Sequence, residues 1–176
     1  MNRTRYLTIA AAFSALAYAA VLVCRVPITS VEFLKYEPKD TVITLAGFML
    51  GAPWAVGISI SVSLIEAVTI STTGIWGFLM NVLSTLSFCL PAVVIYRRFR
   101  KIGAETAGLI LGAIISAGMM MLWNWLVTPI YMGIPREAVE AMLVPVFLPF
   151  NLIKSGINVI LTLILHRALS KVEKMI

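Results

Sequence analysis

Three polar side chains share one face of an otherwise apolar segment near the C-terminus. Asn151, Lys154 and Asn158 are spaced i, i+3 and i+7, which places them on one side of a helix. Lys154 is the only charged residue between positions 144 and 165, so in a membrane helix its ammonium would lie ~15 Å from either end. A lysine at that depth costs about 3 kcal/mol and needs a partner, water or a ligand. The stripe therefore predicts a polar binding site inside the membrane.

Further polar groups in apolar segments are candidates for the same site. Asn124 lies between two tryptophans, with Thr128 one turn further along. Hydrogen bonding between helices and contact with a ligand both explain such an amide, and the same two interpretations hold for Asn81. Glu66 is a second charge in an apolar segment, and three explanations compete for it. It could relay protons, it could lie near an aqueous end of its helix, or it could be a structural partner of Lys154, which is the explanation we favour.

The longest segment that is not apolar runs from Arg25 to Asp40 and mixes aromatic with charged side chains. Its second part, with Thr41 (residues 32–41), could fold over an external cavity as a lid, in which Glu37 accepts hydrogen bonds from ligand hydroxyls. Asp40 or Thr41 is expected to cap the helix that follows, which explains those two residues structurally. The apolar side chains of this lid are Phe33, Leu34 and Tyr36.

The composition is that of an integral membrane protein. The 176 residues are 60% hydrophobic and 12% charged, with a mean hydropathy of +0.97, and a soluble globular domain carries about twice that charge. The net charge of +6 comes from basic residues that flank apolar segments, so no nucleic-acid binding is expected. Cys24 and Cys89 have no metal-ligand spacing and are expected to be two buried thiols.

The elements that position the polar stripe are predicted to be six membrane-spanning helices in one domain, residues 1–176. A break at Gly51-Ala52-Pro53 separates the second span from the third. With six spans and a cytoplasmic N-terminus, nine of the fourteen basic residues lie inside, whereas merging these two spans would place the basic cluster at 97–101 outside. Both termini are therefore expected to be cytoplasmic, with an external loop at 131–142. The predicted spans cover about residues 6–24, 41–52, 54–70, 75–96, 104–130 and 143–165.

Small residues form a second pattern, on the first span. Ala11, Ala15 and Ala19 recur at i, i+4 and i+8, giving a smooth stripe that suits either docking of another helix or internal packing. Sequence motifs of ATPases, metalloproteases and serine hydrolases are absent, and the only histidine, His166, is expected to be solvated at the cytoplasmic end of the last span. The chain is not expected to be an enzyme, and any ATP-driven work would come from another chain.

Three segments carry a family resemblance: Phe-Leu-Lys-Tyr-Glu-Pro-Lys-Asp at 33–40, Trp-Asn-Trp through Thr-Pro-Ile-Tyr at 123–131, and Leu-Pro-Phe-Asn-Leu-Ile-Lys at 148–154. Together they resemble the riboflavin-type S components of energy-coupling factor (ECF) transporters, and the resemblance covers essentially the whole chain. It implies a six-helix subunit in a bacterial plasma membrane that binds riboflavin, or a close flavin, from outside. Such a subunit needs no cofactor and works with a transmembrane coupling protein and two cytoplasmic ATPases.

The resemblance also implies roles for individual residues. It places riboflavin contacts on Asn151, Lys154, Asn124, Glu37 and Thr41. Further candidate contacts in the lid and on the helix faces are Asn81, Thr128, Asn158, Lys35, Tyr36 and Asp40. It places docking on the coupling protein at Ala11, Ala15 and Ala19. Either Glu37 or Glu66 would be the counter-charge of Lys154.

Two other functions compete with this one. The chain could be an S component for another small vitamin or precursor. It could also be a stand-alone secondary carrier in which Glu66 and Lys154 form a proton-coupled pair. Six short helices without visible duplication argue against the carrier, since such carriers usually show paired halves.

Overall fold

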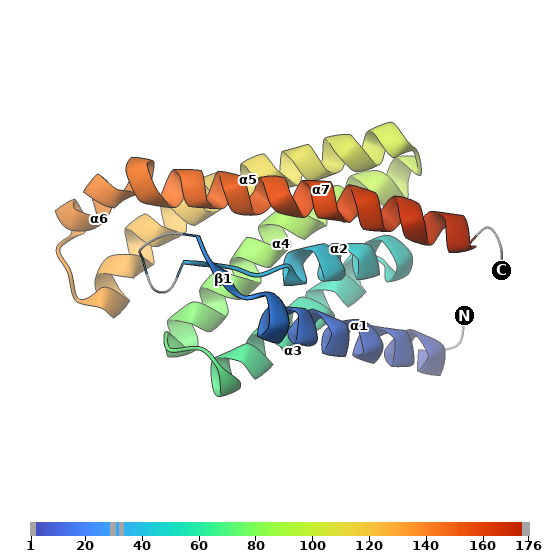
Figure 1. The fold of residues 1–176 in the computed structure, drawn as a ribbon, viewed down its shortest axis with the longest axis horizontal. Coiled ribbons are helices and arrows are strands. Elements are labelled where there is room, and N and C mark those ends of the chain that lie inside the picture. The colour runs from blue at the N-terminus through green and yellow to red at the C-terminus, as the bar shows by residue number, and fades with distance from the viewer. Residues whose placement is uncertain (1–2, 29–30, 32–33, 174–176) are drawn as a thin grey trace.

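The computed structural model describes residues 3–28, 31 and 34–173, and these residues are almost entirely helical (Figure 1). The helices are α1 (Arg3–Cys24), α2 (Lys39–Leu50), α3 (Ala52–Thr69), α4 (Gly74–Phe99), α5 (Ile102–Met132), α6 (Arg136–Met142) and α7 (Leu148–Glu173). A π-helical turn, Leu143–Phe147, joins α6 to α7. Two short antiparallel strands, β1 (Val26–Pro27) and β2 (Lys35–Tyr36), pair between α1 and α2. The predicted all-α fold is confirmed.

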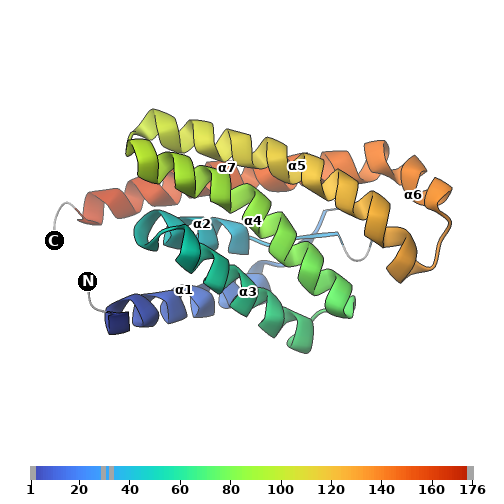
Figure 2. The same cartoon turned by 180° about the vertical axis from the view of Figure 1, so that it is seen from behind.

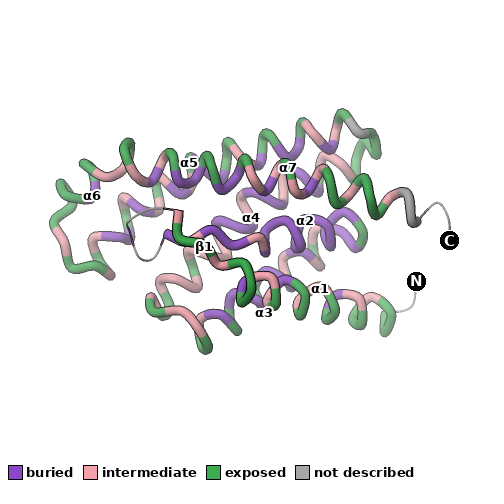
Figure 3. Tube along the Cα trace, viewed as in Figure 1, coloured by how far each residue is buried: buried purple, intermediate pink, exposed green. Residues whose placement is uncertain are grey.

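Within the described part of the chain, five helical segments are long and apolar enough to cross a membrane. They are residues 3–24, 52–69, 74–99, 103–132 and 136–170. The remaining long element, α2, has 12 residues, which corresponds to ~18 Å. It lies in the middle of the bundle and contacts α1, α3, α4 and α7, and nearly all of its residues are buried (Figure 3).

The break between α2 and α3 falls at Gly51, where the sequence predicts it. Gly51 has φ 106°, a conformation that favours glycine, and Pro53 follows in the first turn of α3. Arg97 on α4 covers this break, because its Nη1 donates hydrogen bonds to the carbonyl oxygens of Phe48 (3.4 Å) and Met49 (3.2 Å). Two of the last carbonyls of α2 therefore have a guanidinium as their hydrogen-bond partner.

Two local predictions are wrong. The expected loop at 131–142 is largely helical, since α5 continues to Met132 and α6 runs into α7 through the π-helical turn. That turn contains Pro145, which has no N–H to donate, and a wide turn lets the helix pass a proline. Neither Asp40 nor Thr41 caps α2, which begins at Lys39 without a side-chain cap. Asp40 instead lies in the first turn, with its carboxylate directed into the bundle.

The close approach of α4 and α5 depends on two glycines four residues apart. A Cβ placed on Gly112 would lie 2.1 Å from the carbonyl oxygen of Phe88, and one on Gly108 would lie 2.9 Å from Cα of Ala92. Only glycine lets two helix backbones approach this closely, as in small-residue packing of membrane helices. This pair of helices forms the rigid wall against which α2 and α7 pack.

The start of α1 and the end of α7 lie at one end of the bundle, together with the turn between α4 and α5, and α6 lies at the opposite end (Figures 1 and 2). Cys89 is buried, but Cys24, the last residue of α1, is exposed. The expectation of two buried thiols is therefore wrong for Cys24, because it ends a helix that has only three buried residues.

Candidate functional site

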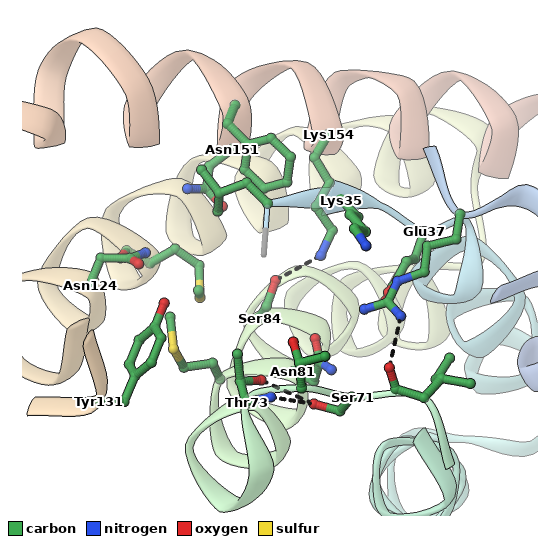
Figure 4. A pocket seen from close by; sticks show the side chains of 18 residues that line it. Lys35, Glu37, Ser71, Thr73, Asn81, Ser84, Asn124, Tyr131, Asn151 and Lys154 are labelled. Atoms are coloured by element: carbon green, nitrogen blue, oxygen red, sulfur yellow. Dashed lines mark hydrogen bonds and ion pairs between the residues drawn. The ribbon is translucent and has the colours of Figure 1, made fainter. Parts of the chain in front are cut away.

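A cavity opens between the strand pair, the α3–α4 turn and helices α4, α5 and α7 (Figure 4). It encloses about 840 Å³ of space between atoms when its open mouth is counted, so part of this volume belongs to the solvent outside. Its lining residues are Arg25, Leu34, Lys35, Glu37, Ile70, Ser71, Thr72, Thr73, Gly77, Met80, Asn81, Ser84, Met120, Asn124, Tyr131, Phe150, Asn151 and Lys154.

Two asparagines from different helices face the cavity near α5 and α7. Nδ2 of Asn124 donates to the carbonyl oxygen of Met120 at 2.7 Å, and Nδ2 of Asn151 donates to that of Phe147 at 2.7 Å. Each amide is thus held by the preceding turn of its own helix. Phe150 and Tyr131 supply aromatic surface beside these amides.

Lys154 reaches the cavity from α7 and pairs with Asp40. Its Nζ lies 3.1 Å from Asp40 Oδ2 and donates to Ser84 Oγ at 3.2 Å. Asp40 also accepts hydrogen bonds from Thr85 at 2.6 Å and from Asn158 at 3.2 Å. The counter-charge of Lys154 is therefore Asp40, and the expectation of Glu37 or Glu66 is wrong. The reason is that α2 packs between α4 and α7 and brings its first turn beneath Lys154.

A second chain of charges lies beside the first. Glu37 forms ion pairs with two cations: its Oε1 lies 2.9 Å from Arg25 Nε, and its Oε2 lies 3.0 Å from Lys39 Nζ. Lys39 also pairs with Glu66, and Asn81 Nδ2 donates to Glu66 Oε2 at 3.1 Å. Glu66 is thus a structural partner, as favoured, but of Lys39 rather than of Lys154.

The two ion networks contain equal numbers of opposite charges. Arg25, Lys39 and Lys154 match Glu37, Asp40 and Glu66, and the side chain of Lys39 is 0% exposed. An ammonium without solvent is tolerated only with paired and hydrogen-bonded partners. The networks therefore join α2, α3, α4 and α7 to the residues that directly follow α1 and β2, around the cavity.

The structure separates the predicted site residues into two groups. Six line the cavity: Asn151, Lys154, Asn124, Glu37, Asn81 and Lys35. Five lie behind this lining: Thr41, Asp40, Tyr36, Asn158 and Thr128.

The second group forms a layer of hydrogen bonds that supports the lining. Tyr36 OH and Thr41 Oγ1 both donate to Asn158 Oδ1, at 3.0 and 3.2 Å, and Thr128 Oγ1 donates to Asn124 Oδ1 at 3.0 Å. Burial, and then the Asp40 carboxylate, raise the pKa of Tyr36 to about 12, so this phenol remains a donor at physiological pH. Of the lid residues, Leu34 lines the cavity, whereas Phe33 lies outside the described residues.

Several lining residues escaped the sequence analysis. Ser84 lies three residues after Asn81, so the i, i+3 periodicity of polar residues on α4 could have found it. The hydroxyls at 71–73 form a polar run between two apolar spans, which is an ordinary loop signal. In the sequence, Arg25 is one of the basic residues that flank apolar segments, which are expected to fix the orientation in the membrane. In the structure, its guanidinium instead lies against Glu37 and the carbonyl oxygen of Ile70.

The other two predicted features lie away from the cavity. Ala11, Ala15 and Ala19 are all exposed, whereas Ala17 is fully buried, so the stripe faces away from the bundle and does not serve internal packing. The expectation of a solvated His166 is wrong. Its Nδ1 lies 2.8 Å from Glu105 Oε1, and its ring packs against Phe48 and Tyr96.

Comparison with known proteins identifies the family of this chain. Residues 5–166 match the family model described as "ECF transporter, substrate-specific component". A solved structure of the S component of a bacterial ECF transporter has the same fold, with a TM-score of 0.85 and 24% sequence identity over 98% of this chain and 99% of that chain. No curated protein matches the sequence. Because the family model spans nearly the whole chain, the protein belongs to the substrate-specific S components of ECF transporters, which are membrane transport subunits.

Proposed function

We propose that this S component binds riboflavin, or a close flavin, in the cavity between α4, α5 and α7. The observation that carries the proposal is the convergence of Asn124, Asn151 and Lys154, three residues from two helices, on one cavity. The sequence motifs that resemble riboflavin-type S components contain these same three residues.

The chemistry of the cavity suits a flavin. Riboflavin joins a flat tricyclic ring, whose edge carries N–H and carbonyl groups, to a chain of hydroxyls. Aromatic and thioether side chains at Phe150, Tyr131 and Met120 offer apolar surface for the ring. The amides of Asn124 and Asn151 offer hydrogen-bonding groups to the ring edge. The charges of the two ion networks balance one another, and Lys35 is a further cation in the lining.

The proposed topology has six membrane segments, with α2 as the second, in one domain over residues 1–176. Both termini are proposed to be cytoplasmic, since the start of α1 and the end of α7 lie at the same end as the α4–α5 turn, which carries the basic cluster at 97–101 (Figure 1). Basic residues concentrate on the cytoplasmic side of membrane proteins. The strand pair then covers the cavity from outside, in the plasma membrane of a bacterium.

The proposed partners are a transmembrane coupling protein and two cytoplasmic ATPases. The exposed stripe of Ala11, Ala15 and Ala19 offers α1 a smooth surface for the coupling protein. A stand-alone carrier with a Glu66–Lys154 proton couple is not supported, because these residues pair with Lys39 and Asp40 instead.

The absorption spectrum of the purified protein tests this function. Protein expressed in a riboflavin-containing cell should co-purify with a yellow ligand that shows flavin absorption bands and is released by denaturation. A matched preparation of Asn151→Ala should carry less flavin per protein. A colourless wild-type protein that also fails to take up added riboflavin would contradict the proposal.

A further inference from the structure

The cavity has a second polar region, at the α3–α4 turn. Of the ligand contacts predicted from the sequence, only Asn81 belongs to this region. Ser71, Thr72, Thr73 and Gly77 line this part of the cavity, across from Asn151 on α7 (Figure 4). The aromatic side chains of the lining, Tyr131 and Phe150, belong to α5 and α7. Three hydroxyl-bearing residues of the lining therefore gather at the α3–α4 turn, whereas its aromatic side chains come from α5 and α7.

The orientation of the Asn81 amide is fixed by Glu66. Asn81 Nδ2 lies 3.1 Å from Glu66 Oε2, and Glu66, only 2% exposed, is paired with Lys39. A carboxylate paired with an ammonium is an acceptor only, so the amide must present its NH₂ group to it. Oδ1 of Asn81 is then the atom left to accept a hydrogen bond from a ligand in the cavity.

Glu66 also holds Ser71, through a hydrogen bond between their backbones. The N–H of Ser71 donates to the carbonyl oxygen of Glu66 at 2.9 Å, which closes the end of α3. Ser71 Oγ accepts from the N–H of Thr73 at 3.2 Å and lies 3.0 Å from Thr73 Oγ1. Gly77 leaves room for this pair, because a Cβ there would lie 1.8 Å from Thr73 Oγ1. The turn thus presents a fixed hydroxyl pair beside Asn81.

We infer that Asn81, Ser71 and Thr73 form a subsite that binds the hydroxylated chain of the ligand, and that Glu66 is the positioning residue of this subsite. The inference rests on the proposed flavin function, and it adds the orientation in which the flavin lies in the cavity. The ring lies toward Tyr131 and Phe150, and the chain points to the α3–α4 turn. Hydroxyls of the chain donate to Asn81 Oδ1 and exchange hydrogen bonds with the Ser71–Thr73 pair.

The test compares two flavins that share the ring. Riboflavin carries the hydroxylated chain, whereas lumiflavin carries a methyl group in its place. Asn81→Ala, and separately Ser71→Ala with Thr73→Val, should weaken riboflavin binding about three- to tenfold, the loss expected for one or two hydrogen bonds. Lumiflavin affinity should stay unchanged in both variants. Thr69→Val is the matched control, because this hydroxyl bonds Tyr18 and the carbonyl oxygen of Ile65 outside the cavity.

Glu66→Gln tests the positioning role separately. A neutral amide can donate to Asn81 as well as accept from it, so the Asn81 amide loses its fixed orientation. The ratio of lumiflavin to riboflavin dissociation constants should fall, while lumiflavin affinity is kept. An equal loss for both flavins would reduce Glu66 to a purely structural role and overturn that part of the inference.

The outcomes separate the inference from the proposed function. If the wild-type protein binds both flavins and the Asn81 and Ser71/Thr73 variants change both affinities equally, or neither, the subsite is wrong and the flavin function stands. If the wild-type protein binds neither flavin, the proposed function fails and the subsite fails with it.

Discussion

The ammonium of Lys154 on α7 lies 3.1 Å from Oδ2 of Asp40 on α2. Thr85 and Asn158 hold the same carboxylate from α4 and α7. One buried ion pair thus ties three helices together directly beneath the cavity. It also leaves Lys154 a fixed position, from which it donates to Ser84 at the cavity wall.

Asp40→Asn should strongly destabilise the protein. The substitution leaves the Lys154 ammonium, whose side chain is 11% exposed, without its carboxylate, and breaking one side of a buried pair costs about 3–5 kcal/mol. Thermal unfolding in detergent should occur at a clearly lower temperature than in the wild type. The double variant Asp40→Asn with Lys154→Met removes the unpaired charge and should recover part of the loss. A wild-type unfolding temperature in Asp40→Asn would show that the pair contributes nothing.

Asn151→Ala should weaken riboflavin binding roughly tenfold, the effect of one lost hydrogen bond of about 1.4 kcal/mol to a ligand. The protein should still insert and fold, because the amide bonds only its own helix among the described residues. Leu152→Ala is the control, since this neighbour is 51% exposed on the outer face of α7. Tryptophan quenching by riboflavin measures both affinities. Equal affinities in the two variants would remove Asn151 from the site.

Periodicity was enough to predict most of the helices and one wall of the site. Asn151, Lys154 and Asn158 do share a face of α7, and the chain does break at Gly51. The shared face of Asn151, Lys154 and Asn158 follows from their i, i+3 and i+7 spacing alone, because that spacing depends only on the geometry of a helix and not on tertiary packing.

The ion pairing could not be predicted in the same way. Whether Lys154 meets Asp40, Glu37 or Glu66 depends on how α2 packs between α4 and α7, which no local pattern encodes. Lys39 illustrates the difficulty, because it reads as an external basic residue at the end of a loop. In the structure it is 0% exposed and joins Glu37 to Glu66. The rotation and depth of the short helix α2 decide both pairings.

Gly112→Ala should destabilise the α4–α5 pair. The new Cβ would lie 2.1 Å from the backbone carbonyl oxygen of Phe88, which cannot move aside as a side chain could. Overpacking of this kind costs about 1–3 kcal/mol. Gly118→Ala on the same helix meets nothing within 4 Å and should be neutral or stabilising by up to about 1 kcal/mol. Unfolding temperatures in detergent compare the two, and equal effects would contradict the close approach.

Ala15→Phe should block uptake while leaving ligand binding intact. Ala15 is exposed on the stripe of small residues along α1, and a phenyl ring there would keep another helix at a distance. Leu16→Phe is the matched control, because Leu16 is 57% exposed but lies off the stripe. Uptake is measured with the coupling protein and ATPases present, and binding with the isolated subunit. Loss of binding in Ala15→Phe would mean that the stripe supports the fold instead of docking.

A titration of the purified, ligand-free protein with riboflavin tests the central claim most directly. The chain has four tryptophans, whose emission overlaps flavin absorption, so binding should quench their fluorescence. The account predicts saturable quenching at micromolar riboflavin or below, with weaker binding in Asn151→Ala and an unchanged affinity in Leu152→Ala. An absence of saturable quenching at micromolar riboflavin in a folded wild-type protein would contradict it.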